Sequence, residues 1–219
     1  MGEEAYNAIK DRIIRMRIAP GQALNTKALA KELGIGMAPL RDALQRLEKE
    51  HLVVILPRKG TYATPMTLVE LQTAFDARTL VERAIWRMAA TRVTEKQLQT
   101  LQAWFADMRL LANKRDFGSF IELDSRFHRE VARISGNVYL EGFLSSVMPT
   151  TQRIWYYVHS GSERPEQSIL EGADGHRPLI EALGKRSVDL AEESITQHIS
   201  NLRCKCLSLL DRPGVSVAM

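Results

Sequence analysis

Cysteine is scarce in this chain, and other residues that mark special classes of protein are also few. Cys204 and Cys206 are the only cysteines among 219 residues, so a framework of disulfide bonds is excluded. Glycine and proline number 13 and 8, too few for a collagen-like or low-complexity chain. No apolar run approaches the roughly 20 residues of a membrane helix, and the acidic start at residues 1–4 lacks the apolar part of a secretion signal. We therefore expect a cytoplasmic protein with no membrane partner.

Charge is distributed unevenly along the chain. The 30 Lys and Arg exceed the 26 Asp and Glu, and the whole excess lies near the N-terminus. Residues 1–65 hold 11 basic and 7 acidic side chains, whereas residues 66–219 hold 19 of each. A small basic module followed by a neutral one indicates a nucleic-acid-binding domain joined to a domain of another purpose.

The first 65 residues combine helical and strand patterns in a short stretch. The predicted elements are helices over 3–17, from Asn25 or Thr26 to Gly34 and over about 37–49, then strands at 53–56 and 61–63. Gly34 separates two helices because glycine accepts a positive φ, and residues 57–60 form the turn of a hairpin. Three helices and a hairpin with net positive charge are the layout of a winged helix-turn-helix.

The rest of the chain is predicted to be helical, with no competing strand signal. The predicted helices lie near 67–91, 95–112, 117–135, 138–158, 166–184 and 187–210. Irregular stretches are expected where glycine or proline falls inside these ranges, at Gly142, Pro149, Gly172, Gly175 and Pro178. We therefore predict a mostly α protein of two domains, a winged helix-turn-helix over 1–65 and an all-helical bundle over 66–219.

The third predicted helix has the pattern of a helix that enters the DNA major groove. Its face opposite the apolar residues carries Met37, Ala38, Arg41, Asp42 and Gln45. Arg41 can reach a guanine edge or a phosphate, and Gln45 can pair with adenine. Arg58 and Lys59 at the hairpin tip can contact phosphates, and Gly60 allows close approach to a groove. A solvated surface arginine is the alternative for Arg41 alone, but the combined order of elements favours DNA binding.

Four segments carry a resemblance to a known family. They are PGQAL at 20–24, LAKELGI at 29–35, PLRDALQRLE at 39–48 and RKG at 58–60. In this order they resemble the GntR family of bacterial repressors, which implies a winged helix-turn-helix that binds DNA. The resemblance implies that Lys27, Arg41 and Gly60 lie at DNA-contacting positions.

The chain departs from this family at the start of the third helix. Where the family usually reads Val-Ser-Arg-Thr-Pro-Val-Arg, residues 35–41 read Ile-Gly-Met-Ala-Pro-Leu-Arg. Gly36 and Ala38 remove two hydroxyls, and Met37 removes an arginine. We expect a different operator, weaker phosphate anchoring, or both, although Met37 or Ala38 can still contact a thymine methyl group.

Four polar residues of the second part lie on helix faces that are otherwise apolar. Asp124 and His128 are four residues apart and share a face, and His176 and His198 each lie among aliphatic residues. Burying such groups costs several kcal/mol, roughly 2–7 for a single unpaired group, unless each finds a partner. A shared divalent cation such as Zn, Ni or Mn would satisfy all four. The alternative is a hydrogen-bonded core without metal.

This second part also resembles a known domain. The segments are RTLVE at 78–82, DSRFH at 124–128, GN at 136–137, HRPLIEAL at 176–183 and HI at 198–199. They resemble the FCD ligand-binding domain that many GntR regulators carry. In many members one Asp and three His bind a metal, which by match are Asp124, His128, His176 and His198. Since all four are present, the resemblance favours the metal-binding branch over the metal-free, acyl-CoA-responsive branch.

Two arginines of the helical part are candidates for binding an effector. Arg78 lies in an apolar arc, with Glu82 one helical turn further. Either the two form an internal ion pair, or Arg78 binds the carboxylate of an effector that also touches the metal, since a guanidinium suits a planar carboxylate. Arg153 is the second candidate. Cys204 and Cys206 are expected to be structural.

The sequence favours a metabolite-responsive DNA-binding repressor rather than an enzyme. A homodimer would present two winged domains to a pseudo-palindromic operator, and a small carboxylate in the helical domain would change the operator affinity. One alternative is a metal-dependent enzyme with a nucleic-acid-binding module, although no separate general base lies near the ligands. Another is a regulator whose Asp/His cluster is structural and whose effector is independent of metal.

Overall fold

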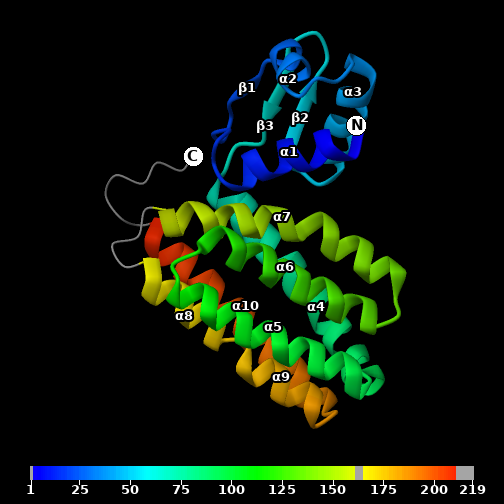
Figure 1. The fold of residues 1–219 in the computed structure, drawn as a ribbon, viewed down its shortest axis with the longest axis vertical. Coiled ribbons are helices and arrows are strands. Elements are labelled where there is room, and N and C mark those ends of the chain that lie inside the picture. The colour runs from blue at the N-terminus through cyan, green and yellow to red at the C-terminus, as the bar shows by residue number, and fades with distance from the viewer. Residues whose placement is uncertain (1, 161–164, 211–219) are drawn as a thin grey trace.

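A computed structural model describes residues 2–160 and 165–210 and divides them into a small N-terminal module above a larger helical body (Figure 1). The module contains α1 Gly2–Ile14, β1 Ala23–Leu24, α2 Thr26–Glu32, α3 Met37–Lys49, β2 Val53–Leu56 and β3 Gly60–Ala63. The body contains α4 Leu68–Arg92, α5 Glu95–Asn113, α6 Phe117–Ile134, α7 Val138–Ser160, α8 Pro165–Asp174, α9 Arg177–Gly184 and α10 Val188–Leu210. The predicted fold class is confirmed. Residues 161–164 and 211–219 of the predicted second domain lie outside the described residues.

The N-terminal module has one strand more than the predicted hairpin. Its antiparallel sheet has the order β1-β3-β2, and Ala23 and Leu24 pair with Tyr62 and Thr61. Two residues are too short to give an alternating pattern, so the sequence does not reveal this strand. The first helix is also shorter than predicted, because it ends at Ile14 and Met16 then takes a positive φ of 58°.

Local sequence explains how α3 is set against α2. The side chain of Asn25 caps α2 by accepting a hydrogen bond from the backbone of Ala28 at 3.0 Å. Gly34 then takes a φ of +65°, which reverses the chain between the two helices. The apolar side of α3 joins a core separate from that of the helical body, formed with α1 and the sheet around Ile9, Leu40 and Leu47. The opposite side of α3 is left in solvent.

Capping residues define the starts of several helices in the body. Thr67 with Glu70 and Thr94 with Gln97 form complete capping boxes at α4 and α5, and Asp116 caps α6. Helix α4 packs against α6, α7 and α10, and its buried residues Phe75, Ile85 and Trp86 join the main core. Within the described residues, no helix combines the length and the apolar character needed to span a membrane.

Glycine and proline interrupt the helices less often than predicted. The expected irregularities at Gly142 and Pro149 are wrong, because α7 continues through both. Packing of flanking residues such as Leu144 and Met148 into the core offsets the one backbone hydrogen bond that Pro149 cannot make. The predicted helix over 166–184 does divide, into α8 and α9, with the break at Gly175 and His176 and with Pro178 in the first turn of α9.

Gly172 does not break α8, but it has a packing role there. A Cβ at Gly172 would lie 3.0 Å from the ring of Trp155. Glycine therefore lets α8 approach α7 closely, and the sequence signal of a breaker marks a contact between helices instead.

Candidate metal centre and DNA-binding surface

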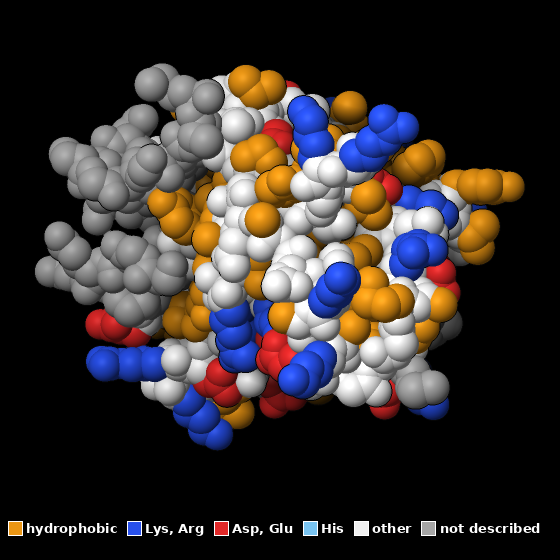
Figure 2. Space-filling view, turned by 90° about the horizontal axis from the view of Figure 1, so that it is seen from above, with side chains coloured by type: hydrophobic (Ala, Val, Ile, Leu, Met, Phe, Trp, Pro, Cys, Tyr) orange, Lys and Arg blue, Asp and Glu red, His pale blue; other side chains and the backbone are white. Residues whose placement is uncertain are grey.

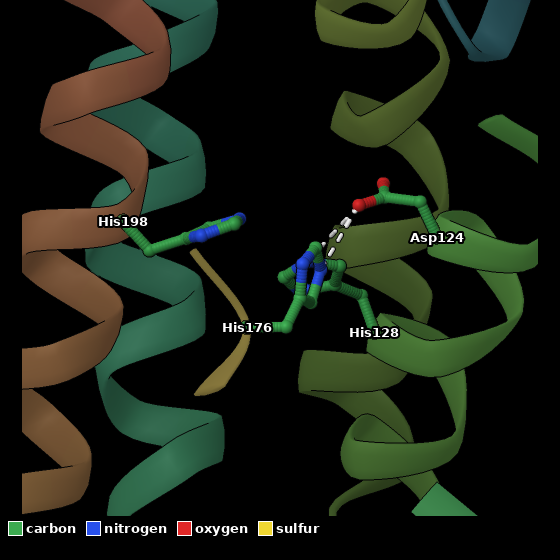
Figure 3. Close-up of side chains that lie close together, drawn as sticks. All are labelled: Asp124, His128, His176 and His198. Carbon is green, nitrogen blue, oxygen red and sulfur yellow. Dashed lines mark ion pairs between the residues drawn. The ribbon is translucent and has the colours of Figure 1, made fainter. Parts of the chain in front are cut away.

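The structure brings together the four polar residues that the sequence marks. Asp124 and His128 come from α6, His176 from the break between α8 and α9, and His198 from α10 (Figure 3). One ligand atom of each residue lies within 4.8 Å of the others. Asp124, His128 and His176 are buried, and His198 is partly exposed. Four groups able to bind a metal therefore converge from three separate parts of the chain.

Hydrogen bonds at Nδ1 fix the orientation of each imidazole. His176 Nδ1 lies 2.9 Å from the carbonyl of Gly172, and His198 Nδ1 lies 3.3 Å from the carbonyl of Gly175. Because a carbonyl only accepts, Nδ1 donates in both rings. His128 Nδ1 lies 2.6 Å from Oε2 of the buried Glu82. In each ring Nε2 then faces the cluster. Metal-binding histidines are usually oriented in this way, by a hydrogen bond from the ring nitrogen that does not bind the metal.

The inner atoms of the cluster lack partners of their own. Nε2 of His176 lies 3.1 Å from Oδ1 of Asp124, and Nε2 of His128 lies 3.9 Å from the same oxygen. Neither Nε2 forms an aligned hydrogen bond with any described residue. A lone pair facing a carboxylate at such a distance needs a proton or a cation between them. The donor set therefore fits a divalent cation such as Zn, Ni or Mn.

The electrostatics of the cluster keep its carboxylate ionised. Burial opposes ionisation, but the close approach of His176 and then of His128 outweighs it and holds the pKa of Asp124 well below its ordinary value. For His198, burial and then the nearby His176 and His128 lower the pKa well below its ordinary value. An ionised carboxylate and a neutral imidazole are the forms that bind metals.

A cavity of about 410 Å³ opens onto this cluster. Its lining comes from five helices and the α8–α9 break, and comprises Arg78, Asp124, Thr151, Gln152, Trp155, Glu171, Gly172, Gly175, His176, His198, Asn201, Leu202, Cys204 and Lys205. Arg78 is 2% exposed; its Nε donates to Glu82 at 2.6 Å and its Nη1 donates to Thr151 at 3.1 Å. Its Nη2 has no hydrogen-bond partner among the described residues. Arg78 therefore forms the ion pair with Glu82 and still has one N–H donor group, at Nη2, without a partner among the described residues.

Arg153 lies away from the cavity. Its Nη1 donates to the carbonyl of Thr64 at 2.7 Å, in the segment that joins the N-terminal module to α4. Burial lowers the pKa of Arg153 to about 10. Residue Thr151, two positions earlier on α7, contacts Arg78 in the cavity wall. Arg153 therefore joins α7 to the segment after the N-terminal module, while its Nε and Nη2 have no hydrogen-bond partner among the described residues. Its binding of an effector stays a prediction.

Sequence reasoning missed the contact between Glu82 and His128. The sequence does mark Glu82, as an acidic residue one turn from Arg78 in an apolar arc of α4. Its second partner is 46 positions further along the chain, and no local pattern predicts that pairing. Thr151, the other partner of Arg78, is likewise visible only in the structure.

The residues predicted to contact DNA are all exposed on the N-terminal module. Gly36, Met37, Ala38, Arg41 and Gln45 are exposed at the start and along the outer side of α3. Lys27 at the start of α2 and the hairpin tip at Arg58, Lys59 and Gly60 are exposed as well. Figure 2, which looks down on this module, shows Lys and Arg side chains projecting among hydrophobic and uncharged ones.

Another arginine of α3, Arg46, contacts helix α1. Arg46 forms an ion pair with Glu3 of α1, and its guanidinium lies 3.9 Å from the centre of the Tyr6 ring. It therefore contributes to the packing of α1 on α3, whereas Arg41 is exposed and carries no ion pair among the described residues.

Comparisons with known proteins agree with this architecture. The profile of the bacterial regulatory proteins of the gntR family matches residues 1–63, and that of the FCD domain matches residues 73–201. The chain therefore belongs to the GntR family of bacterial regulatory proteins, with an FCD domain after its winged helix-turn-helix, and it is a DNA-binding transcriptional regulator.

Curated relatives resemble the chain over most of its length. The HTH-type transcriptional repressor RspR of Escherichia coli K12 is 25% identical over 202 residues, which is 92% of this chain and 87% of that protein. The repressor GlaR of the same strain is 26% identical over 207 residues, 90% of this chain and 91% of that protein.

Solved structures share the fold. E. coli McbR/YncC matches with a TM-score of 0.85 and 18% identity over 96% of this chain and 98% of that chain. A putative transcriptional regulator GntR from Rhodococcus sp. RHA1 matches with a TM-score of 0.70 and 19% identity, over 94% of this chain and 97% of that one. At such identities the likeness concerns the fold alone.

Proposed function

We propose that this regulator is a cytoplasmic repressor whose operator affinity is controlled by a small carboxylate bound beside a divalent cation in the helical domain. One observation carries the proposal: three imidazoles and a buried carboxylate converge, and three of these four groups line one cavity with Arg78, whose Nη2 has no partner among the described residues. The named relatives RspR and GlaR are repressors, which supports the sign of the regulation.

Operator binding is assigned to the exposed face of the N-terminal module. Arg41 and Gln45 on α3 are suited to base edges, and Lys27, Arg58 and Lys59 to phosphates. Gly36, Met37 and Ala38 lie at the start of the same helix, where small or apolar side chains allow close approach to a thymine methyl group. We propose a homodimer on a pseudo-palindromic site, because one such helix reads only a half-site.

The cation would be held by Asp124, His128, His176 and His198. Zn, Ni and Mn are all compatible with one carboxylate and three imidazoles. When bound, the cation supplies positive charge and open coordination positions at the base of the cavity. Arg78 would bind the effector carboxylate through Nη2, because its Nε and Nη1 are already bonded to Glu82 and Thr151.

This proposal is tested by metal analysis and ligand screening on one preparation. The protein, purified without chelator or His tag, should contain about one divalent cation per chain. Small mono- and dicarboxylates should then raise its unfolding temperature when metal is present, and not after chelation. A chain that takes up no Zn, Ni or Mn would overturn the metal assignment and leave the cluster a structural one.

The DNA-binding face gives a matched pair of substitutions on one helix. Arg41→Ala is expected to weaken operator binding roughly ten- to a hundredfold, because a base or phosphate contact is lost. Arg46→Ala removes an arginine of the same helix whose charge is already paired with Glu3, so its effect should be much smaller. Fluorescence anisotropy with a selected operator, at several salt concentrations, measures both. Equal losses for the two variants would contradict the assigned face.

A further inference from the structure

Glu82 has an unusual set of neighbours. Its side chain is 0% exposed. Its Oε1 accepts from Nε of Arg78 at 2.6 Å, and its Oε2 lies 2.6 Å from Nδ1 of His128 and 3.2 Å from the indole N–H of Trp86. One buried carboxylate thus touches both a residue of the cation cluster and the arginine in the cavity wall.

We propose that Glu82 is the positioning residue that orients His128 toward the cation and Arg78 toward the effector, and so joins the two parts of the site. The inference rests on the proposed cation site, and it adds a residue that itself touches neither the cation nor the effector. Glu82 acts through its two neighbours.

Hydrogen-bond chemistry determines how His128 is oriented. An ionised carboxylate only accepts, so a nitrogen 2.6 Å from its oxygen must carry a proton. Nδ1 of His128 is therefore the protonated nitrogen, and the lone pair of Nε2 faces Asp124 and His176. The ion pair of Glu82 with Arg78, in which Oε1 lies 2.6 Å from Nε, is the contact expected of an ionised carboxylate.

The same carboxylate limits how Arg78 can turn. With Nε held by Glu82 and Nη1 by Thr151, the guanidinium plane is fixed at two points. Its third nitrogen, Nη2, has no partner among the described residues. A fixed plane with one free donor at the cavity, which Asp124, His176 and His198 also line, suits an anion that spans the arginine and the cation.

Glu82→Gln distinguishes this role from simple space filling, because a glutamine has nearly the same shape. Its amide has one accepting and one donating end. The accepting oxygen is expected to face the charged Nε–H of Arg78, so the amide N–H₂ faces Nδ1 of His128, and the longer hydrogen bond from Trp86, at 3.2 Å, is lost. Nδ1 must then accept, and the ring proton moves to Nε2, where it blocks the cation. The reverse amide orientation leaves two donors facing each other at Arg78.

The test measures Zn²⁺ affinity of the full chain by competition with a chromophoric chelator. Glu82→Gln is expected to bind Zn²⁺ about 10- to 100-fold more weakly than the wild type, the usual cost of losing an outer contact to a ligating histidine. The matched control is Glu192→Gln, the same acid-to-amide change in a carboxylate of α10 that accepts from Nε of Arg83 on α4 at 2.9 Å and does not line the cavity. Its Zn²⁺ affinity should be unchanged.

A second measurement needs no metal, and its wild-type part needs no variant. In ¹⁵N-labelled wild-type protein, the ¹⁵N shift of His128 should be that of a protonated Nδ1. In Glu82→Gln it should be that of an unprotonated Nδ1, with the proton on Nε2. A ring that merely filled space would not change its protonated nitrogen.

The outcomes separate this inference from the proposed function. A wild-type chain that binds none of Zn²⁺, Ni²⁺ and Mn²⁺ overturns both. If it binds Ni²⁺ or Mn²⁺ and not Zn²⁺, the same comparison of wild type and Glu82→Gln is made with that ion. A wild type that binds Zn²⁺, with Glu82→Gln binding equally well, overturns the role of Glu82 alone. If Glu82→Gln does not fold, the wild-type spectrum decides, since an unprotonated Nδ1 on His128 overturns the inference and a protonated one supports it.

Discussion

Replacing His176 with alanine is expected to weaken Zn²⁺ binding at least about a hundredfold, because losing even an outer contact to a ligand costs about 10- to 100-fold. His176 is the one cluster residue contributed by the break between α8 and α9, and it is 1% exposed. Its Nδ1 is already bonded to the carbonyl of Gly172, and its Nε2 lies nearest to Asp124. The residues on either side of it, Gly175 and Arg177, offer no metal ligand in their side chains.

The loss should appear in stability as well as in metal content. The cluster joins α6, the α8–α9 break and α10, which are distant in the sequence, so a bound cation stabilises only the folded chain. At a free metal concentration of about a hundred times the Kd, this linkage amounts to about 2.7 kcal/mol. Thermal unfolding with Zn²⁺ and with chelator should therefore differ clearly for the wild type and by at most about 0.4 kcal/mol for His176→Ala.

A second histidine provides the control for this prediction. His51 is exposed in the N-terminal module and has a positive φ of 56°, which asparagine tolerates better than alanine. His51→Asn should keep both the metal content and its effect on unfolding. Metal retained by His176→Ala, measured by plasma mass spectrometry, would place the binding site elsewhere in the chain.

Much of the candidate site could be predicted because helical periodicity reports burial. Asp124 and His128 share a face by their spacing alone, and His176 and His198 are marked by the apolar residues around them. What periodicity cannot give is the pairing between faces. The contact between Glu82 and His128 depends on how α4 packs on α6, which is a property of the assembled core.

The same limit explains the errors in the fold. From the sequence, glycine and proline are expected to interrupt helices. Pro149 nevertheless lies inside a continuous helix, because the residues on both sides of it pack into the core. Gly172 likewise serves the approach of α8 to Trp155 rather than a break. By contrast, Gly175 does mark the end of α8 and Pro178 the start of α9. The break between these two helices places His176 in the cluster.

Arg153 illustrates a different limit, since its sequence context indicates that it is buried but does not reveal its partner. A buried arginine on α7 was expected to bind an anion in the helical domain. Its guanidinium holds the carbonyl of Thr64 beside the N-terminal module, two residues after Thr151 in the cavity wall. Helix α7 therefore contacts both the cavity and the connection to the DNA-binding module, so any displacement of α7 would reach both.

Replacing Trp86 with alanine is expected to lower the free energy of unfolding by about 3–5 kcal/mol, the usual cost of deleting a large buried aromatic side chain. Trp86 is 0% exposed and lies behind the cluster, with its ring 6.1 Å from that of Phe127 and 6.3 Å from that of His128. Its removal leaves a cavity beneath His128 and takes a hydrogen bond from Glu82.

Trp104 provides the matched comparison, since it is only partly buried and Arg126 lies over its ring at 4.9 Å. Trp104→Ala should cost about 1–2 kcal/mol, from partial burial and a surface cation–π contact. Urea unfolding followed by circular dichroism measures both variants without depending on tryptophan fluorescence. Equal losses would contradict the view that the core is most tightly packed behind the cluster. A much larger loss for Trp86→Ala, with weaker Zn²⁺ binding in that variant alone, is expected if the orientation of His128 depends on the packing beneath it.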